Sequence, residues 1–410
     1  MRVYGFVSIS SRLAKKFRVL AAGESQQQER FWNLCYPDGT PQPIASHSGL
    51  VATRAESLYV QVEARVCETR SMANEKVRWA VFGAARIATR KVIPALQKGE
   101  WSEVIAIASR DLSRARQAAA DLGIPKAFGS YEEVLADPAV EAVYIPLPNH
   151  MHVPWSIRAA QAGKHVLCEK PIAMTVAECR DLIAARDRAG IRLGEAFMVR
   201  THPQWLRARE LARSGAIGDL RAVTCAFSYF NRNAGDIRNI PEFGGGAIKD
   251  IGCYPIQISR FLFGEEPANV TAILEKDPDF QTDRLSSAVL AFPSGHCVFT
   301  VSTQLVYHQR VQILGTQGRI EIEVPFNPPP DRACRLLIDS GADVWGGGIR
   351  IEEFAPCDQF TIQGDQFSRA VRGLGPVPTP LEDSLANMAA IEAVFESART
   401  GRTIRPSTVA

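Results

Sequence analysis

A regular alternation of apolar strands and helical stretches is the feature that most restricts the fold of this chain. The apolar runs are VRWAVF (77–82), EVIAIAS (103–109), AVEAVYIPLP (139–148), HVLCE (165–169) and RLGEAFMV (192–199). A helical pattern lies between successive runs, and strands that alternate with helices typically build a parallel sheet covered on both faces. Segment 74–200 is therefore predicted to be an α/β domain with a doubly wound parallel sheet.

The sequence pattern changes after residue 200, where β-rich sequence replaces the alternation of strands and helices. One helix, PQWLRARELARSG (203–215), precedes apolar runs at 219–230, 269–276, 285–303, 310–324 and 335–340. FPSGH and GTQG have the composition of hairpin turns. Segment 201–410 is predicted to be an α+β domain with a large open, mainly antiparallel sheet. A helix over 383–401 is expected to pack back on the first domain.

Bulk properties exclude several classes of partner. The chain has 410 residues and a formal net charge of only +3, which predicts neither nucleic acid nor an anionic membrane as a partner. No run approaches the roughly 18 apolar residues of a membrane span. The nine cysteines include no CxxC pair. We therefore predict reduced thiols, no metal site and a cytoplasmic location.

Residues 1–73 differ from the rest, because GESQQQER and YPDGTPQPIASHSG are polar and rich in turn residues. They are predicted to form a poorly ordered extension. Met72 immediately precedes the regular pattern and would serve as an alternative start. Two interpretations stay open: an N-terminal arm, or a segment absent from the native protein.

A candidate dinucleotide site follows the first strand, in VFGAARIA (81–88). Small residues occupy the places of G-x-G-x-x-G/A: Gly83 permits a tight turn, Ala85 permits close approach to a pyrophosphate, and Ala88 permits close helix–strand packing. The helix that begins here would offer free N–H groups to phosphates. The predicted cofactor contacts in this loop are Gly83, Ala84, Ala85, Arg86 and Ile87.

The end of the second strand, IASRD, favours NADP over NAD. NAD sites usually place an acidic residue there, to accept from the ribose 2′-OH. Here Ser109 and Arg110 stand at the tip, with Arg114 one helical turn later. A hydroxyl and guanidinium groups suit a 2′-phosphate. Asp111 is the counter-evidence, although it is expected to lie in the turn.

IPLPNHMH follows the next strand, at the sheet edge where ligands bind in open α/β sheets. Pro148 and Asn149 are predicted to line the nicotinamide ribose, and His150 or His152 could donate to it.

The decapeptide AGKHVLCEKP (162–171) ends a predicted strand with an acid, a base and a proline. Lys170 would lie at the sheet edge, where desolvation would lower its pKa and let it exchange a proton. Pro171 favours an extended Lys170. Glu169 would either orient Lys170 or face another loop, and is included among the cofactor contacts.

Further along, GGGAIKDIGCYP (244–255) places Asp250 and Tyr254 four residues apart, on one face of a helical turn. Pro255 is expected to kink this helix and aim Tyr254 outward. A cation near Tyr254 would lower the pKa of its hydroxyl.

These motifs together resemble the glucose–fructose oxidoreductase/inositol dehydrogenase/MocA (Gfo/Idh/MocA) superfamily over about residues 76–405. EAFMVRTHPQ and GGGAIKDIGCYPI are most similar to the aldose-oxidising and dihydrodiol dehydrogenase branch. The resemblance implies a Rossmann domain, a C-terminal domain whose open sheet forms dimers, and NAD(P)-dependent chemistry on sugars or polyols. It places Tyr254 at the general acid/base position and Asp250 at an orienting position, with Lys170 as the third catalytic residue.

The resulting prediction is an NADP-dependent enzyme that oxidises an aldose at C1 to a lactone. Candidate sugar contacts, besides Asp250 and Tyr254, are Arg200, His202, Tyr229, Asn231, Arg232 and Arg238. Three alternatives stay open. The chain could shuttle hydride between two aldoses with tightly bound NADP, could oxidise D-xylose or a trans-1,2-dihydrodiol, or could be a non-catalytic dinucleotide sensor.

Overall fold

The computed structural model describes residues 75–407. The predicted extension over 1–73, together with Met72, lies outside the described residues. In the described part, no helix is long and apolar enough to cross a membrane.

The predicted parallel sheet is confirmed, with six strands in the order β3-β2-β1-β4-β5-β6. All of its pairs are parallel. The strands are β1 (Val77–Phe82), β2 (Ser102–Ala108), β3 (Lys126–Phe128), β4 (Ala142–Ile145), β5 (His165–Cys168) and β6 (Leu193–Glu195). The order reverses between β1 and β4, so the carboxyl ends of these strands form the usual ligand edge of an open α/β sheet.

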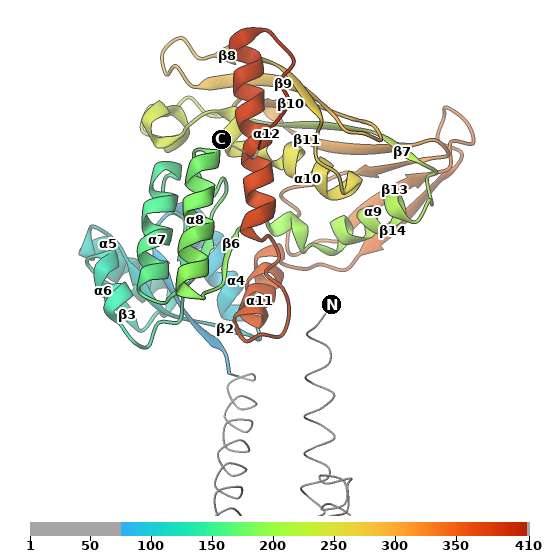
Figure 1. Cartoon of the computed structure of the whole chain (residues 1–410). Coiled ribbons are helices and arrows are strands. Elements are labelled where there is room, and N and C mark those ends of the chain that lie inside the picture. The colour runs from blue at the N-terminus through green and yellow to red at the C-terminus, as the bar shows by residue number, and fades with distance from the viewer. Residues whose placement is uncertain (1–74, 408–410) are drawn as a thin grey trace, which may run out of the picture. The chain divides into compact units, whose positions relative to one another are not determined.

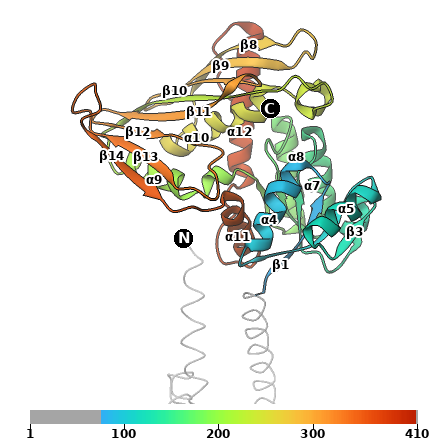
Figure 2. The ribbon, with the colours of Figure 1, turned by 180° about the vertical axis from the view of Figure 1, so that it is seen from behind.

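Both faces of this sheet are covered, which explains why its strands read as continuous apolar runs. The residues of β1 alternate between two cores, with Trp79 on one face of the sheet and Phe82 on the other. The helices that follow the strands are α4 (Ile93–Lys98), α5 (Leu112–Leu122), α6 (Tyr131–Ala136), α7 (His152–Gln161) and α8 (Val176–Ala189). Residues of α7 and α8 join the Phe82 core, and residues of α4 and α5 join the Trp79 core. Figures 1 and 2 show these helices beside the parallel sheet from two opposite sides.

Local sequence signals set the ends of these helices. Asp111 caps α5 by accepting from the Ser113 and Arg114 N–H groups, and Gly123 ends it in the left-handed conformation at φ 65°. Thr175 caps α8 by accepting from the Glu178 N–H. Such caps satisfy the backbone groups that a helix leaves unpaired at its ends.

The predicted second sheet is also confirmed. It has eight strands in the order β14-β13-β12-β11-β7-β10-β9-β8, and only the β7–β10 pair is parallel. The strands are β7 (Leu220–Phe230), β8 (Asn269–Lys276), β9 (Asp283–Ala291), β10 (His296–Ser302), β11 (Gln304–Gly315), β12 (Arg319–Ile322), β13 (Cys334–Asp339) and β14 (Ile349–Phe354). The helices α9 (Pro203–Arg213) and α10 (Cys253–Phe263) pack against this sheet.

The two C-terminal helices return to the parallel sheet. The sequence did not predict α11 (Gln359–Val371), which packs on α4 and places the Ser368 hydroxyl 3.0 Å from the Trp79 indole nitrogen. The long helix α12 (Leu381–Thr400) contacts α8 as well as β8 (Figure 1). Its Glu392 carboxylate accepts from the Val176 N–H at 2.7 Å.

Candidate active site

The turn after β1 has the geometry that the small-residue motif predicts. Gly83 adopts φ +89°, a conformation that favours glycine, and its N–H donates to the Ala108 carbonyl at 2.7 Å. A Cβ at this position would lie 3.2 Å from the Leu147 side chain. The helix that follows passes through a π-helical turn, Ala88–Val92, into α4, and Ala88 is buried in the core. The loop from Gly83 to Ile87 therefore leads directly into a helix N-terminus.

The end of β2 presents one hydroxyl and two guanidinium groups. Ser109 follows the strand directly, and its hydroxyl accepts from the Asp111 N–H at 3.3 Å. Arg110 and Arg114 are exposed. The Asp111 carboxylate is engaged in capping α5, where it also accepts from the Ser113 hydroxyl at 2.6 Å. Asp111 thus lies in the turn, as expected, with its carboxylate already bonded.

The loop after β4 joins the two halves of the described chain. The Asn149 amide donates to the Gly244 carbonyl at 2.9 Å, and the His150 ring stacks on Phe243 with centroids 4.7 Å apart. Pro148 immediately precedes them and is partly buried.

The predicted cofactor contact of His152 is wrong. Its side chain is 0% exposed, and its Nδ1 and Nε2 each lie 2.7 Å from a backbone carbonyl, of Pro171 and Leu147 respectively. Burial lowers the pKa of His152 to about 4, so the imidazole is neutral at neutral pH. His152 ties two loops together and presents no atom to a ligand.

Glu169, whose role the sequence left open, bonds a side chain of the neighbouring strand β4. Its Oε1 accepts from the Tyr144 hydroxyl at 2.5 Å, and burial raises the pKa of this carboxyl. Tyr144 lies within β4 and is fully buried. Glu169 therefore anchors the end of β5 to β4. The peptide bond between Lys170 and Pro171 is cis.

Lys170 lies at the end of β5 and reaches across to the segment before α10. Its Nζ donates to the Asp250 carbonyl at 2.5 Å and to the Asp250 Oδ1 at 3.3 Å, with the Lys170 side chain 12% exposed. Burial disfavours the ammonium form, but the adjacent Asp250 carboxylate outweighs burial and holds the pKa of Lys170 well above its ordinary value. The expectation of a lowered lysine pKa is wrong.

Asp250 connects three other side chains, those of Lys170, Tyr229 and Arg238. It lies in a π-helical turn, Ile248–Gly252, and its Oδ2 accepts from the Tyr229 hydroxyl at 2.6 Å and from the Arg238 Nε at 3.0 Å. Although burial opposes ionisation, Arg238 and Lys170 hold the pKa of Asp250 well below its ordinary value. We call Lys170, Asp250, Tyr229 and Arg238 the Lys170 cluster.

Tyr254 borders this cluster, but it is turned inward. The Lys170 Nζ lies 5.2 Å from the Tyr254 ring centroid. The Tyr254 hydroxyl lies 3.5 Å from the Met198 sulfur, and the side chain is 5% exposed. The expected outward orientation is wrong, because α10 continues through Pro255 with its first turn packed in the core. Burial raises the pKa of Tyr254, against the expected lowering, and Lys170 offsets only part of this effect.

Two predicted sugar contacts lie away from the Lys170 cluster. Arg200 pairs with Asp383 of α12 at 3.5 Å and stacks over Phe261 of α10. Arg232 pairs with Asp279 at 2.5 Å in a surface turn. Neither guanidinium group bonds a member of the Lys170 cluster among these ion pairs, and their contact with a sugar stays a prediction. His202 is also fully buried, where it caps α9.

The sequence matches two family models in succession. Residues 77–197 match an oxidoreductase family with an NAD-binding Rossmann fold, GFO_IDH_MocA, and residues 205–321 match the GFO/IDH/MocA C-terminal domain. The chain belongs to the Gfo/Idh/MocA oxidoreductase family. The predicted family and the predicted enzyme class, an oxidoreductase, are confirmed.

Similar proteins cover nearly the same part of this Gfo/Idh/MocA oxidoreductase. An uncharacterized oxidoreductase from Rhizobium meliloti is 48% identical over 79% of this chain and 98% of its own length. D-xylose 1-dehydrogenase (NADP(+)) 2 from Haloferax volcanii is 39% identical over 80% and 98%. A 3-ketoreductase from Actinomadura kijaniata in complex with NADP and TDP-benzene superimposes with a TM-score of 0.73 at 30% identity, covering 79% and 98%.

Sequence reasoning missed some of the residues that shape the site of this oxidoreductase, and it did not foresee the contact that another one makes. Tyr144 fixes Glu169, and its only signal was a tyrosine inside an apolar strand. Tyr229 was one of several candidate sugar contacts, and the structure instead bonds its hydroxyl to Asp250. Asp283 was not considered, although its carboxylate accepts from the Ile248 N–H at 2.7 Å, at the start of the turn that carries Asp250.

Proposed function

We propose that this oxidoreductase uses NADP to oxidise an aldose at C1 to a lactone, with Lys170 as the proton-handling residue. The observation that carries the proposal is the contact of Lys170 with Asp250 at the end of β5, where open α/β sheets bind ligands. The D-xylose 1-dehydrogenase among the relatives supports an aldose as substrate.

The residues at the ends of β1 and β2 fit NADP. Gly83 leaves room where a Cβ would press on Leu147, next to the helix N-terminus that would hold the phosphates. Ser109, Arg110 and Arg114 would hold a 2′-phosphate, and the capping role of Asp111 removes the carboxylate that an NAD site would need. When bound, NADP supplies the hydride acceptor for the substrate carbon.

In the proposed chemistry, Lys170 forms a hydrogen bond with the substrate oxygen that gains or loses a proton. Oxidation requires the neutral amine, since only that form can accept the hydroxyl proton. Asp250 orients Lys170 and favours its ammonium form, and Arg238 and Tyr229 hold the Asp250 carboxylate in place. Tyr254 supports Lys170 through its ring face, and its hydroxyl has no place in the proton transfer that we propose.

The raised pKa of Lys170 favours a second candidate, in which the enzyme reduces a sugar carbonyl. The ammonium form predominates at neutral pH and is the form that donates a proton to a carbonyl oxygen. The 3-ketoreductase among the similar structures is consistent with this direction. An enzyme that retained NADP and alternated between two aldoses would use both forms of Lys170 in one cycle.

One experiment separates these functions. The purified full chain is examined spectroscopically for bound NADP(H) and then assayed on aldoses, keto-sugars and a trans-1,2-dihydrodiol, with added NADP, with added NAD and with neither. Aldose oxidation that depends on added NADP supports the proposal. Turnover of aldose pairs without added cofactor indicates the shuttle, and reduction alone indicates the second candidate. The absence of turnover with every substrate of the panel would indicate a non-catalytic dinucleotide sensor.

The matched variant is Lys170→Ala. We expect it to lower kcat by about 10²–10⁴-fold, the usual contribution of a general acid–base residue. NADP binding, measured by fluorescence titration, should persist because the dinucleotide contacts that we propose lie mainly at the ends of β1 and β2. Near-wild-type turnover in this variant would remove Lys170 from the mechanism.

A further inference from the structure

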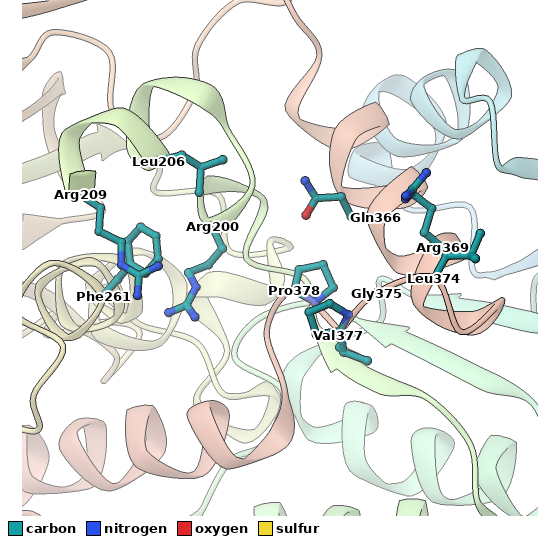
Figure 3. A pocket seen from close by; sticks show the side chains of 11 residues that line it. Arg200, Leu206, Arg209, Phe261, Gln366, Arg369, Leu374, Gly375, Val377 and Pro378 are labelled. Carbon is teal, nitrogen blue, oxygen red and sulfur yellow. The ribbon is translucent and has the colours of Figure 1, made fainter. Parts of the chain in front are cut away.

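A pocket lies apart from the Lys170 cluster, between α9, α10 and α11. Its volume is about 400 Å³, within the range of small-molecule sites. Residues from the turn before α9, from the three helices and from the loop before α12 line it: Arg200, Leu206, Arg209, Phe261, Gln366, Arg369, Leu374, Gly375, Pro376, Val377 and Pro378. Figure 3 shows arginines on both sides of the pocket, with the 375–378 loop between them. No residue of the Lys170 cluster lines this pocket.

Two of these arginines share one aromatic ring. The guanidinium carbons of Arg200 and Arg209 lie 4.4 and 4.3 Å from the centroid of Phe261. Stacking on a ring attracts a cation and holds it in place. It provides no hydrogen-bond acceptor, so the guanidinium N–H groups still need partners.

One carboxylate, that of Asp383, is shared between Arg200 of this pair and the neighbouring Arg260. Arg200 contacts Asp383 at 3.5 Å, but the same carboxylate oxygen also lies 3.3 Å from Arg260. The buried Nε of Arg209 has no hydrogen-bond partner among the described residues. The side chain of Arg369 lies over Trp101, and no acidic residue of the described chain lines the pocket. Buried donors without acceptors are rare in native proteins, and an ordered water or a bound anion supplies the acceptor in such cases.

We propose that this pocket binds a small organic anion with a phosphate or carboxylate group. Planar guanidinium groups match the oxygen geometry of both groups and bond them more strongly than neutral donors do. Leu206, Phe261 and Val377 supply apolar surface for the carbon part of the ligand. This site is additional to the substrate and dinucleotide sites of the proposed function and does not depend on them.

Calorimetric titration of the full chain tests the site. The protein is first saturated with NADP, so that added anions do not enter the dinucleotide site. The probes are inorganic phosphate, glycerol phosphate and citrate. We expect saturable binding of at least one probe. Preference for the phosphates assigns a phosphate group, preference for citrate assigns a carboxylate, and comparable binding supports the shared oxyanion chemistry. No saturable binding of any probe would overturn the proposal.

Matched variants locate the binding. Arg209→Gln and the exposed Arg369→Gln should each weaken binding about tenfold, because each removes charge-assisted hydrogen bonds. Arg209→Lys keeps the charge without the planar fork, so its affinity should lie between those of the wild type and Arg209→Gln. Arg221→Gln, which removes an exposed arginine outside the pocket, should leave binding unchanged. Unchanged affinity in both Arg209→Gln and Arg369→Gln would refute the site. Since Arg369 is exposed, its variant still tests the site if Arg209→Gln fails to fold.

Discussion

Asp250 is the residue on which the charge state of the candidate active site depends. Its carboxylate contacts two cations, Lys170 and Arg238, and accepts from the Tyr229 hydroxyl. Removal of the Asp250 carboxylate should therefore lower the pKa of Lys170, because burial alone would favour the neutral amine.

We predict that Asp250→Asn moves the pH profile of oxidation to lower pH. Because oxidation needs neutral Lys170, and Asp250 raises the pKa of Lys170, wild-type kcat/KM should still be rising with pH well above neutrality. Without the carboxylate, the rise should shift down by about 1–3 pH units, the usual effect of a close opposite charge. The measurement is kcat/KM for the aldose against pH.

Tyr229→Phe is the control for that experiment. It removes one hydrogen bond to Asp250 but leaves the carboxylate beside Lys170, so its profile should move far less than that of Asp250→Asn. Coincident profiles for Asp250→Asn and the wild type would show that Asp250 does not set the charge of Lys170.

We predict that Arg110→Ala raises KM for NADP about tenfold or more and leaves KM for NAD nearly unchanged. The reason is that a guanidinium bonds a 2′-phosphate strongly, and NAD has none. Steady-state kinetics with both cofactors provides the measurement. Arg116→Ala, at an exposed position of α5, the helix that begins just after Arg110, serves as the control. An equal loss for both cofactors would contradict a role for Arg110 in choosing NADP.

At the scale of residues, the sequence predicted contacts correctly where both residues belong to recognisable motifs. The family resemblance brought Lys170 and Asp250 together correctly. It could not foresee that Arg200 binds Asp383, because that pairing depends on how α12 packs on α10. It could not foresee the orientation of Tyr254 either, since Pro255 occurs in the first turn of a helix, where proline is tolerated.

At the scale of elements, the loop between β7 and α10 carries half of the Lys170 cluster. This loop holds Arg238, and its chain passes very close to itself at Gly245. A Cβ on Gly245 would overlap the backbone carbonyl groups of Arg238 and Ile240. The glycine is thus required by close backbone approach, not by its own φ, which is not positive.

We predict that Gly245→Ala destabilises the fold by about 1–3 kcal/mol, the usual cost of overpacking, and lowers kcat. Backbone atoms cannot rotate away as a side chain can, so the loop must move and take Arg238 with it. Thermal unfolding and steady-state assays measure both effects. Gly235→Ala, in the same loop, meets only the Asn233 side chain, at 3.4 Å, and should be nearly neutral. Equal behaviour of the two variants would contradict this account.

Elements were predicted best where the apolar period was strong. β1 and β8 have the predicted bounds, whereas the strand expected over 139–148 is only Ala142–Ile145. α11 was missed because Gly364 interrupts its helical pattern. That glycine lies against Leu96, so a tertiary contact outweighs the low helix propensity of glycine there.

At the scale of the whole molecule, one face of the eight-stranded sheet is covered by α9, α10 and α12, and the opposite face carries exposed apolar side chains. Ile273 is 77% exposed and Val306 is 78% exposed. Val289 and Val298 are direct cross-strand neighbours on β9 and β10, and both are exposed. Apolar patches of this kind typically mark interfaces between proteins.

We predict that a second copy of the chain covers this face, so that the protein is a dimer in solution. Val289→Glu combined with Val298→Glu would place two like charges side by side in the interface, where burying unpaired charges is costly. Size-exclusion chromatography with light scattering should give a dimer for the wild type and a monomer for the double variant. Val344→Glu, at a turn residue that is 92% exposed, should remain dimeric. Thermal unfolding checks that the double variant is folded. A monomeric wild type, or a double variant that stays dimeric, would exclude this face as the interface.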